Sequence, residues 1–139
     1  MTFGNVPILW SSKLQSEIAL STLEAEYVAL SQGMRELVAT RRLVLELCSR
    51  IHFNINDAST VSCAWEDNMG TQNLANSKGS IMSPLTKHIG VKYHWFISKI
   101  QKGIIEFHRI DTNFQQADIL TKGLTRLSFE QVRKLVMRW

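Results

Sequence analysis

Three carboxylate residues lie on or directly after helices and strands that the sequence pattern predicts. Glu26 borders the apolar face of a predicted helix, because it lies three residues after Leu23 and four before Leu30. Asp67 ends a predicted strand and precedes a helix, a position where α/β folds expose functional groups. Asp118 lies on a later predicted helix. Carboxylate oxygens are the ligands that Mg²⁺ prefers in proteins. Each residue also has a simpler interpretation, which is solvation for Glu26 and Asp118 and a helix N-cap for Asp67.

The elements that must position these carboxylates alternate between helices and strands, which predicts an α/β fold. A long helix is predicted from Ser21 to about Cys48, because Ser21 and Glu24 have the spacing of a capping box. Two strands are predicted, over 60–67 and 104–110. The other predicted elements are strands at Val6–Ser12 and Glu17–Leu20, a short helix over 68–75, a helix that ends at Gly103, a helix opened by Thr112 with Gln115, and a last helix begun by Ser128 with Gln131.

Composition is that of one globular domain over residues 1–139. The chain is 45% hydrophobic and 20% charged, which argues against disorder. Its net charge of +4 favours an anionic partner, nucleic acid before a membrane. No apolar run approaches the ~20 residues of a membrane span, and the N-terminus has no secretory pattern, so we expect an intracellular protein without membrane contact. Cys48 and Cys63 lie in apolar runs without metal-ligand spacing, which predicts reduced core residues; a disulfide or ligand pair is the alternative.

One face of the predicted helix before Gly103 is basic. Its members share helical spacing, and Lys87 directly precedes them: His88, Lys92, Trp95, Lys99 and Lys102. The cations suit phosphate groups, and the indole of Trp95 offers a surface for a sugar or base, so we predict a nucleic-acid contact here. The alternative is a solvated helix face that carries one aromatic residue.

Three segments resemble one protein family. Residues 21–30 read S-T-L-E-A-E-Y-V-A-L, which resembles the S-T-x-E-A-E-Y-x-A-L signature of the ribonuclease H domain of copia-type (Ty1/copia) retrotransposon polyproteins. Residues 63–68 resemble the family segment that ends in Asp-Asn, and residues 116–122 resemble its Q-x-A-D-I-L-T-K motif. The segments 86–89 and 91–94 are also similar, so the resemblance extends from Gly4 to about Leu135.

The resemblance implies a site and an activity. The resemblance places Glu26, Asp67 and Asp118 at the family positions that hold two Mg²⁺ ions, for which Mn²⁺ can substitute. With these ions the family's enzymes hydrolyse the RNA strand of an RNA–DNA hybrid. The implied fold is a ribonuclease H-like mixed sheet flanked by helices. The implied partners are the hybrid and the upstream reverse transcriptase portion of a polyprotein, in a cytoplasmic particle or the nucleus.

The sequence departs from the family in one respect. Ribonucleases H carry a fourth acidic ligand, an Asp on their first strand, and this chain has no Asp before Asp57. That strand is the central one of the family's sheet, so we expect a domain truncated at its N-terminus, with unpaired strand edges and no activity as this fragment. Three interpretations stay open: a ribonuclease that needs the strand, a non-catalytic nucleic-acid-binding remnant, and a decayed element product.

Overall fold

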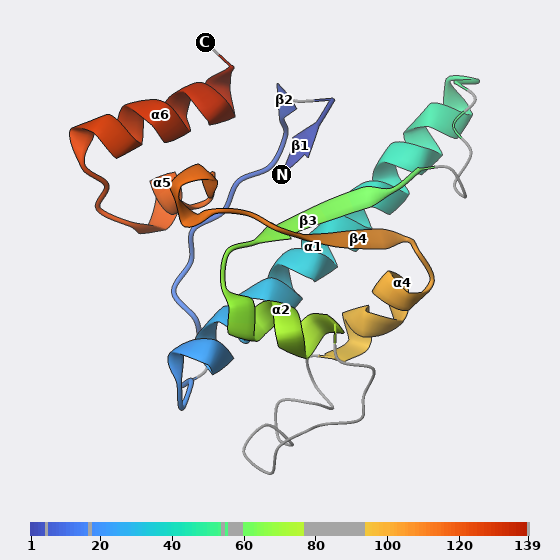
Figure 1. Cartoon of the computed structure of the whole chain (residues 1–139). Helices are drawn as coiled ribbons and strands as arrows, with labels where there is room; N and C mark the ends of the chain where they lie inside the picture. Colours follow the sequence, from blue (N-terminus) through green and yellow to red (C-terminus); the bar gives the residue numbers. More distant parts are fainter. Residues whose placement is uncertain (5, 17, 54, 56–59, 77–93, 139) are drawn as a thin grey trace.

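The computed structural model of the chain describes residues 1–4, 6–16, 18–53, 55, 60–76 and 94–138. Helices and strands are mixed along these residues, which confirms a mixed α/β architecture (Figure 1). The elements are β1 (Thr2–Phe3), β2 (Val6–Pro7), α1 (Thr22–Arg50), β3 (Ser62–Glu66), α2 (Met69–Asn76), the 3₁₀ turn η2 (His94–Phe96), α4 (Ile97–Gln101), β4 (Ile105–Arg109), the 3₁₀ turn η3 (Thr112–Phe114), α5 (Asp118–Thr121) and α6 (Arg126–Met137).

The strands form two separate two-stranded sheets. β1 and β2 pair antiparallel, whereas β3 and β4 pair parallel, with a register that runs from Ser62 opposite Ile105 to Glu66 opposite Arg109. Among the described residues no ladder joins the two sheets. The ribonuclease H arrangement of the sheet remains a prediction.

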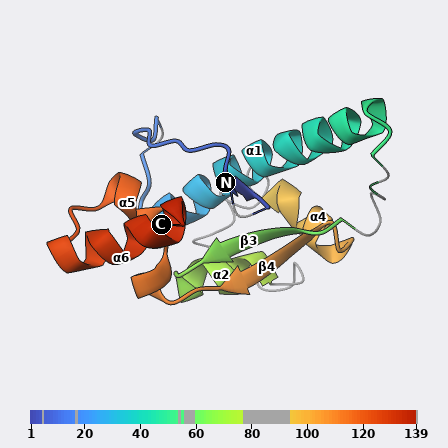
Figure 2. The same ribbon diagram turned by 90° about the horizontal axis from the view of Figure 1, so that it is seen from above.

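Helix α1 begins at the predicted capping box. Ser21 Oγ accepts a hydrogen bond from the backbone N–H of Glu24 at 3.1 Å, and the Glu24 carboxylate accepts one from the N–H of Leu20 at 2.7 Å. The Glu24 N–H, which the helix itself leaves unsatisfied, thus finds a partner. The reciprocal hydrogen bond goes to Leu20, one residue before the cap, rather than to Ser21. The helix runs to Arg50, slightly beyond the predicted end, and lies across one face of the β3–β4 pair (Figures 1 and 2).

The core lies between α1 and the β3–β4 pair. Its fully buried members come from α1, η2 and β4, and they are Tyr27, Val28, Met34, Phe96 and Ile105. The rings of Tyr27 and Phe96 have centroids 5.7 Å apart, in contact range for an aromatic pair. Ala64 of β3 and Phe107 of β4 pack against this cluster. The core therefore fixes the position of α1, and with it that of Glu26, relative to the end of β3.

The placement of Cys63 in the core is wrong. Side chains of a strand alternate between two faces, and in β3 it is Ser62, Ala64 and Glu66 that turn toward α1. Cys63 is exposed and Trp65 is 54% exposed on the opposite face. The polar Ser62 is tolerated inside because its hydroxyl accepts a hydrogen bond from Arg41 Nη1 at 3.2 Å. Cys48 is half-buried, and both thiols are free.

The two strands predicted between Val6 and Leu20 are also largely wrong. Only Val6–Pro7 is a strand, and its partner is Thr2–Phe3, which the sequence pattern did not indicate. The following segment is irregular, with Trp10 71% exposed and Leu14 fully exposed. An apolar alternation forms a strand only where a partner strand completes its hydrogen bonds, and the described residues supply none here.

Capping groups near the C-terminus differ from the prediction by one to three residues. Asp111 rather than Thr112 caps η3, since its carboxylate accepts from the N–H of Asn113 at 2.9 Å, and the helix that follows begins only at Asp118. Thr125 rather than Ser128 caps α6, and its hydroxyl accepts from the N–H of Ser128 at 3.3 Å. In both places several Ser, Thr or Asp residues lie close together, so capping preference alone does not select one.

Helix α4 ends at Gln101, and the predicted Gly103 takes the left-handed position just after that end. Gly103 has φ +69°, and the N–H groups of Gly103 and Ile104 donate to the carbonyls of Ile100 and Lys99 at 2.9 and 3.0 Å. This pair of hydrogen bonds is the Schellman motif, which satisfies carbonyls at the helix end and leads directly into β4.

The two glycines Gly103 and Gly33 make a matched test of this helix end. An added Cβ would meet nothing within 4 Å at either position, but only Gly103 has a left-handed φ. Gly103→Ala is therefore expected to destabilise the chain by about 1–2 kcal/mol. Gly33→Ala, inside α1, is expected to stabilise it by about 1 kcal/mol. Urea denaturation measures the change in the free energy of unfolding for each variant. If both variants are stabilised, or both are destabilised, the left-handed helix end is contradicted.

Candidate metal-binding carboxylate site

The end of β3 is held by a small network of hydrogen bonds. The Glu66 carbonyl accepts from the N–H of Ile110 at 3.1 Å and from Gln72 Nε2 at 2.6 Å, while Glu66 Oε1 accepts from the N–H of Asn68 at 3.1 Å. Asn68 Oδ1 accepts from the N–H of Thr71 at 3.1 Å and so caps α2. The interpretation of Asp67 as the N-cap is therefore wrong, and its carboxylate is left for another role.

Glu66 is a buried carboxyl group among other acids. Its pKa is raised to about 7, chiefly by burial and also by the charges of Glu26 and Asp67, against the hydrogen bond from the Asn68 N–H. Only 8% of the residue is exposed. The pKa shift shows that Glu26, on α1, and Asp67, after β3, lie close enough to Glu66 for their charges to act on it.

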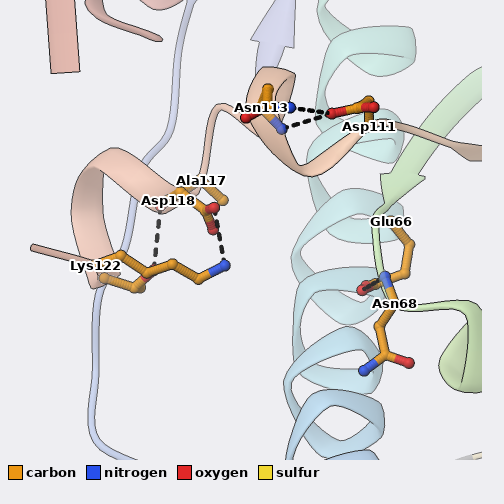
Figure 3. A network of polar contacts seen from close by, with 8 residues as sticks. Glu66, Asn68, Asp111, Asn113, Ala117, Asp118 and Lys122 are labelled. Carbon is orange, nitrogen blue, oxygen red and sulfur yellow. Dashed lines mark hydrogen bonds and ion pairs between the residues drawn. The ribbon is translucent and has the colours of Figure 1, made fainter. Parts of the chain in front are cut away.

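Asp118 joins the same group of charges from α5. The residue is 7% exposed, and its Oδ2 accepts an ion-paired hydrogen bond from Lys122 Nζ at 2.9 Å (Figure 3). This hydrogen bond raises the pKa of Lys122, and the charges of Asp67 and Glu26 raise it as well. The three predicted acids therefore act on one lysine although they come from α1, the end of β3 and α5. We call Glu26, Glu66, Asp67 and Asp118 the carboxylate site.

The carboxylate site is a loose cluster in this structure. Glu26 is exposed, Asp67 is half-buried and Asp118 is buried. Within the described part of the chain, no three of these carboxylates have donor atoms all within 4.8 Å of one another. Such close packing is what a single ion needs, whereas the ligands of two ions about 4 Å apart are spread more widely.

Sequence reasoning missed Glu66 in this site. The alternation of the strand predicted over 60–67 contained the signal, because it places Val61, Cys63, Trp65 and Asp67 on one face. The remaining face had to carry Ala64 and Glu66, and Ala64 packs on the core. A carboxyl group placed beside a core residue is the kind of group whose pKa burial raises.

The predicted nucleic-acid contact is only partly within the described residues. Lys87, His88 and Lys92 lie outside them, Lys99 is half-buried and Lys102 is exposed. Trp95 packs against α1, where its indole Nε1 donates to the hydroxyl of the fully buried Ser31 at 3.1 Å. Its ring meets Phe96 edge to face. Packing therefore accounts for Trp95, and a contact between this residue and nucleic acid remains a prediction.

Among the described residues, no helix is both long enough and apolar enough to cross a membrane. No protein-family profile matches the chain, and no solved structure does so.

Comparison with known proteins identifies the class of protein to which the chain is related. It is homologous over nearly its whole length to copia-type retrotransposon Pol polyproteins. It is 37% identical over 135 residues to the retrovirus-related Pol polyprotein from transposon TNT 1-94 of Nicotiana tabacum, covering 97% of this chain and 9% of the relative. The polyproteins from transposons RE2 and RE1 of Arabidopsis thaliana are each 29% identical, over 96% and 91% of this chain and 8% of their own length. The chain thus matches a short segment of each polyprotein.

Proposed function

We propose that the chain is a ribonuclease H-type segment of a copia-type polyprotein that hydrolyses the RNA strand of an RNA–DNA hybrid. The observation that carries the proposal is the shared electrostatic neighbourhood of Glu26, Asp67 and Asp118, which act together on Lys122 although they come from three elements. These are also the three acids that lie on the family-like motifs. The reverse transcriptase portion as partner and an intracellular location belong to the same proposal.

The donor set fits a hard divalent cation. All the ligands that the site offers are carboxylate oxygens, which suit Mg²⁺ or Mn²⁺ and not a soft metal. Glu26, Asp67 and Asp118 would hold a pair of such ions, which would supply an activated water and stabilise the departing 3′ oxygen. Lys122 meanwhile balances the charge of the buried Asp118, and the network around Asn68 fixes the backbone that carries Asp67.

The test compares two chains on a labelled RNA–DNA hybrid in Mg²⁺. The family's fourth Asp is absent from this sequence, so the 139-residue chain is expected to cleave slowly or not at all. A chain extended upstream by the family's Asp-bearing strand is expected to cleave the RNA strand, and a chelator is expected to stop it.

Two outcomes would replace the proposal. If the extended chain binds the hybrid without cleaving it, the chain is a nucleic-acid-binding remnant. If it neither binds nor cleaves while remaining folded by circular dichroism, the chain is a decayed element product.

A further inference from the structure

A second set of metal-ligating side chains lies on the exposed face of the β3–β4 pair. The parallel register places Cys63 opposite Glu106 and Trp65 opposite His108. Because side chains alternate along a strand, all four residues share one face, away from α1. The Cys63 thiol, a Glu106 carboxylate oxygen and a His108 ring nitrogen all lie within 4.8 Å of one another.

The three potential ligands are already partly arranged. His108 Nε2 and Glu106 Oε2 are 3.0 Å apart. The imidazole of His108 stacks on the indole of Trp65, with ring centroids 4.8 Å apart and planes inclined by 28°. This stacking limits rotation of the imidazole, so Trp65 acts as a positioning residue. The ligands come from neighbouring paired strands, and this places them on a firmer base than a loop would provide.

We propose that Cys63, Glu106 and His108 bind one Zn²⁺ ion. A thiolate, an imidazole and a carboxylate are the three side-chain ligands found around zinc, with metal–ligand bonds of about 2.0–2.3 Å. Atoms bound to one such ion lie about 3–4 Å apart, so ligand atoms that all lie within 4.8 Å of one another need only a small shift to bind it. Mg²⁺ is a poor match, because it prefers an all-oxygen environment. Three protein ligands leave the fourth tetrahedral position for water or an added ligand.

The zinc site is separate from the carboxylate site. Cys63, Glu106 and His108 lie on the outer face of the sheet, whereas Glu66 turns inward with Ala64 toward α1. Bound zinc would replace the His108–Glu106 hydrogen bond by two metal bonds and would link β3 to β4. Its occupancy does not depend on ribonuclease activity, and the two proposals fail independently.

The first experiment titrates the untagged 139-residue chain with Co²⁺, a spectroscopic probe for zinc sites. We expect one equivalent to bind with a cobalt–thiolate charge-transfer band, and Zn²⁺ but not excess Mg²⁺ to remove that band. Cys63→Ser is expected to abolish the band. His108→Phe, which keeps an aromatic ring against Trp65, is expected to weaken zinc binding at least about tenfold. Cys48→Ser is the matched control and is expected to bind as the parent chain does.

The second experiment needs no variant and therefore does not depend on the folding of one. Alkylation of the two thiols is followed by mass spectrometry, with and without one equivalent of Zn²⁺. We expect zinc to slow alkylation of Cys63 by at least about tenfold and to leave Cys48 unchanged. Binding without a thiolate band, or equal alkylation of Cys63 in both conditions, would overturn the zinc site.

Discussion

Asp67→Asn, in a chain extended upstream by the Asp-bearing strand, is expected to abolish Mg²⁺-dependent cleavage of an RNA–DNA hybrid. An amide cannot supply the anionic oxygen that the ions require, and Asn68 already caps α2, so the loss should not come from the helix end. We expect a rate reduction of at least about a thousandfold, which corresponds to ~4 kcal/mol of transition-state stabilisation. Single-turnover cleavage at saturating hybrid measures it.

The matched control is Asp111→Asn. Asp111 caps η3 through a hydrogen bond to the N–H of Asn113, and Asn is an equally good cap, so this variant makes the same chemical change outside the carboxylate site. It is expected to keep the parental rate.

Hybrid binding should largely survive Asp67→Asn and weaken when Lys92 and Lys99 are both changed to Ala, with a shallower salt dependence. Full cleavage by the Asp67→Asn chain would remove Asp67 from the site.

Stability should fall as the pH rises, because of Glu66. Its pKa is raised from 4.5 to about 7 in the folded chain, chiefly by burial. Between these two values the folded chain holds a proton that the unfolded chain has released, so raising the pH favours unfolding. The stabilisation is fully present below pH 4.5 and is lost by about pH 7. The loss is roughly 3 kcal/mol, at 1.36 kcal/mol per pKa unit. Urea denaturation across this range, in chelator, measures it.

Glu66→Gln isolates this contribution. The amide does not titrate, and its carbonyl oxygen still accepts the hydrogen bond from the Asn68 N–H, so the decline in stability between about pH 5 and 7 should largely disappear. Glu36→Gln, which changes an exposed carboxyl group of α1, is the control and should retain the decline. If the decline persists in Glu66→Gln, another group causes it.

Elements with strong local signals were predictable from the sequence. The capping box at Ser21 and the apolar face that includes Leu23 and Leu30 were sufficient to define α1, since helical hydrogen bonds are local. Gly103 marked the end of α4 for the same reason. Strands depend on partners distant in sequence. β3 and β4 are strands because each is the other's partner, whereas the apolar residues from Ile8 to Leu20 have no such partner among the described residues and did not form the predicted strands.

The faces of the elements were harder to predict than their bounds. Because Cys63 is apolar and Ser62 is polar, the sequence suggested that Cys63 is buried and Ser62 exposed. In the structure Cys63 is exposed and Ser62 turns toward α1. The hydroxyl of Ser62 accepts a hydrogen bond from Arg41, which is distant in sequence. The packing of Trp95 against α1 was hard to predict for the same reason, because its hydrogen-bond partner Ser31 lies on another element. For the candidate site, the motifs indicated Glu26, Asp67 and Asp118, whereas Glu66 and the pairing of Lys122 with Asp118 depended on three-dimensional neighbours.

The packing of β2 against α6 has a consequence for how the chain folds. These two elements come from opposite ends of the sequence, and both views place the N-terminal strands beside the C-terminal helices (Figures 1 and 2). Contacts between residues far apart in sequence form slowly, so this contact should form late, after α1 and the β3–β4 pair. During synthesis the N-terminal hairpin leaves the ribosome well before α6 exists, and its exposed apolar residues are then available to chaperones.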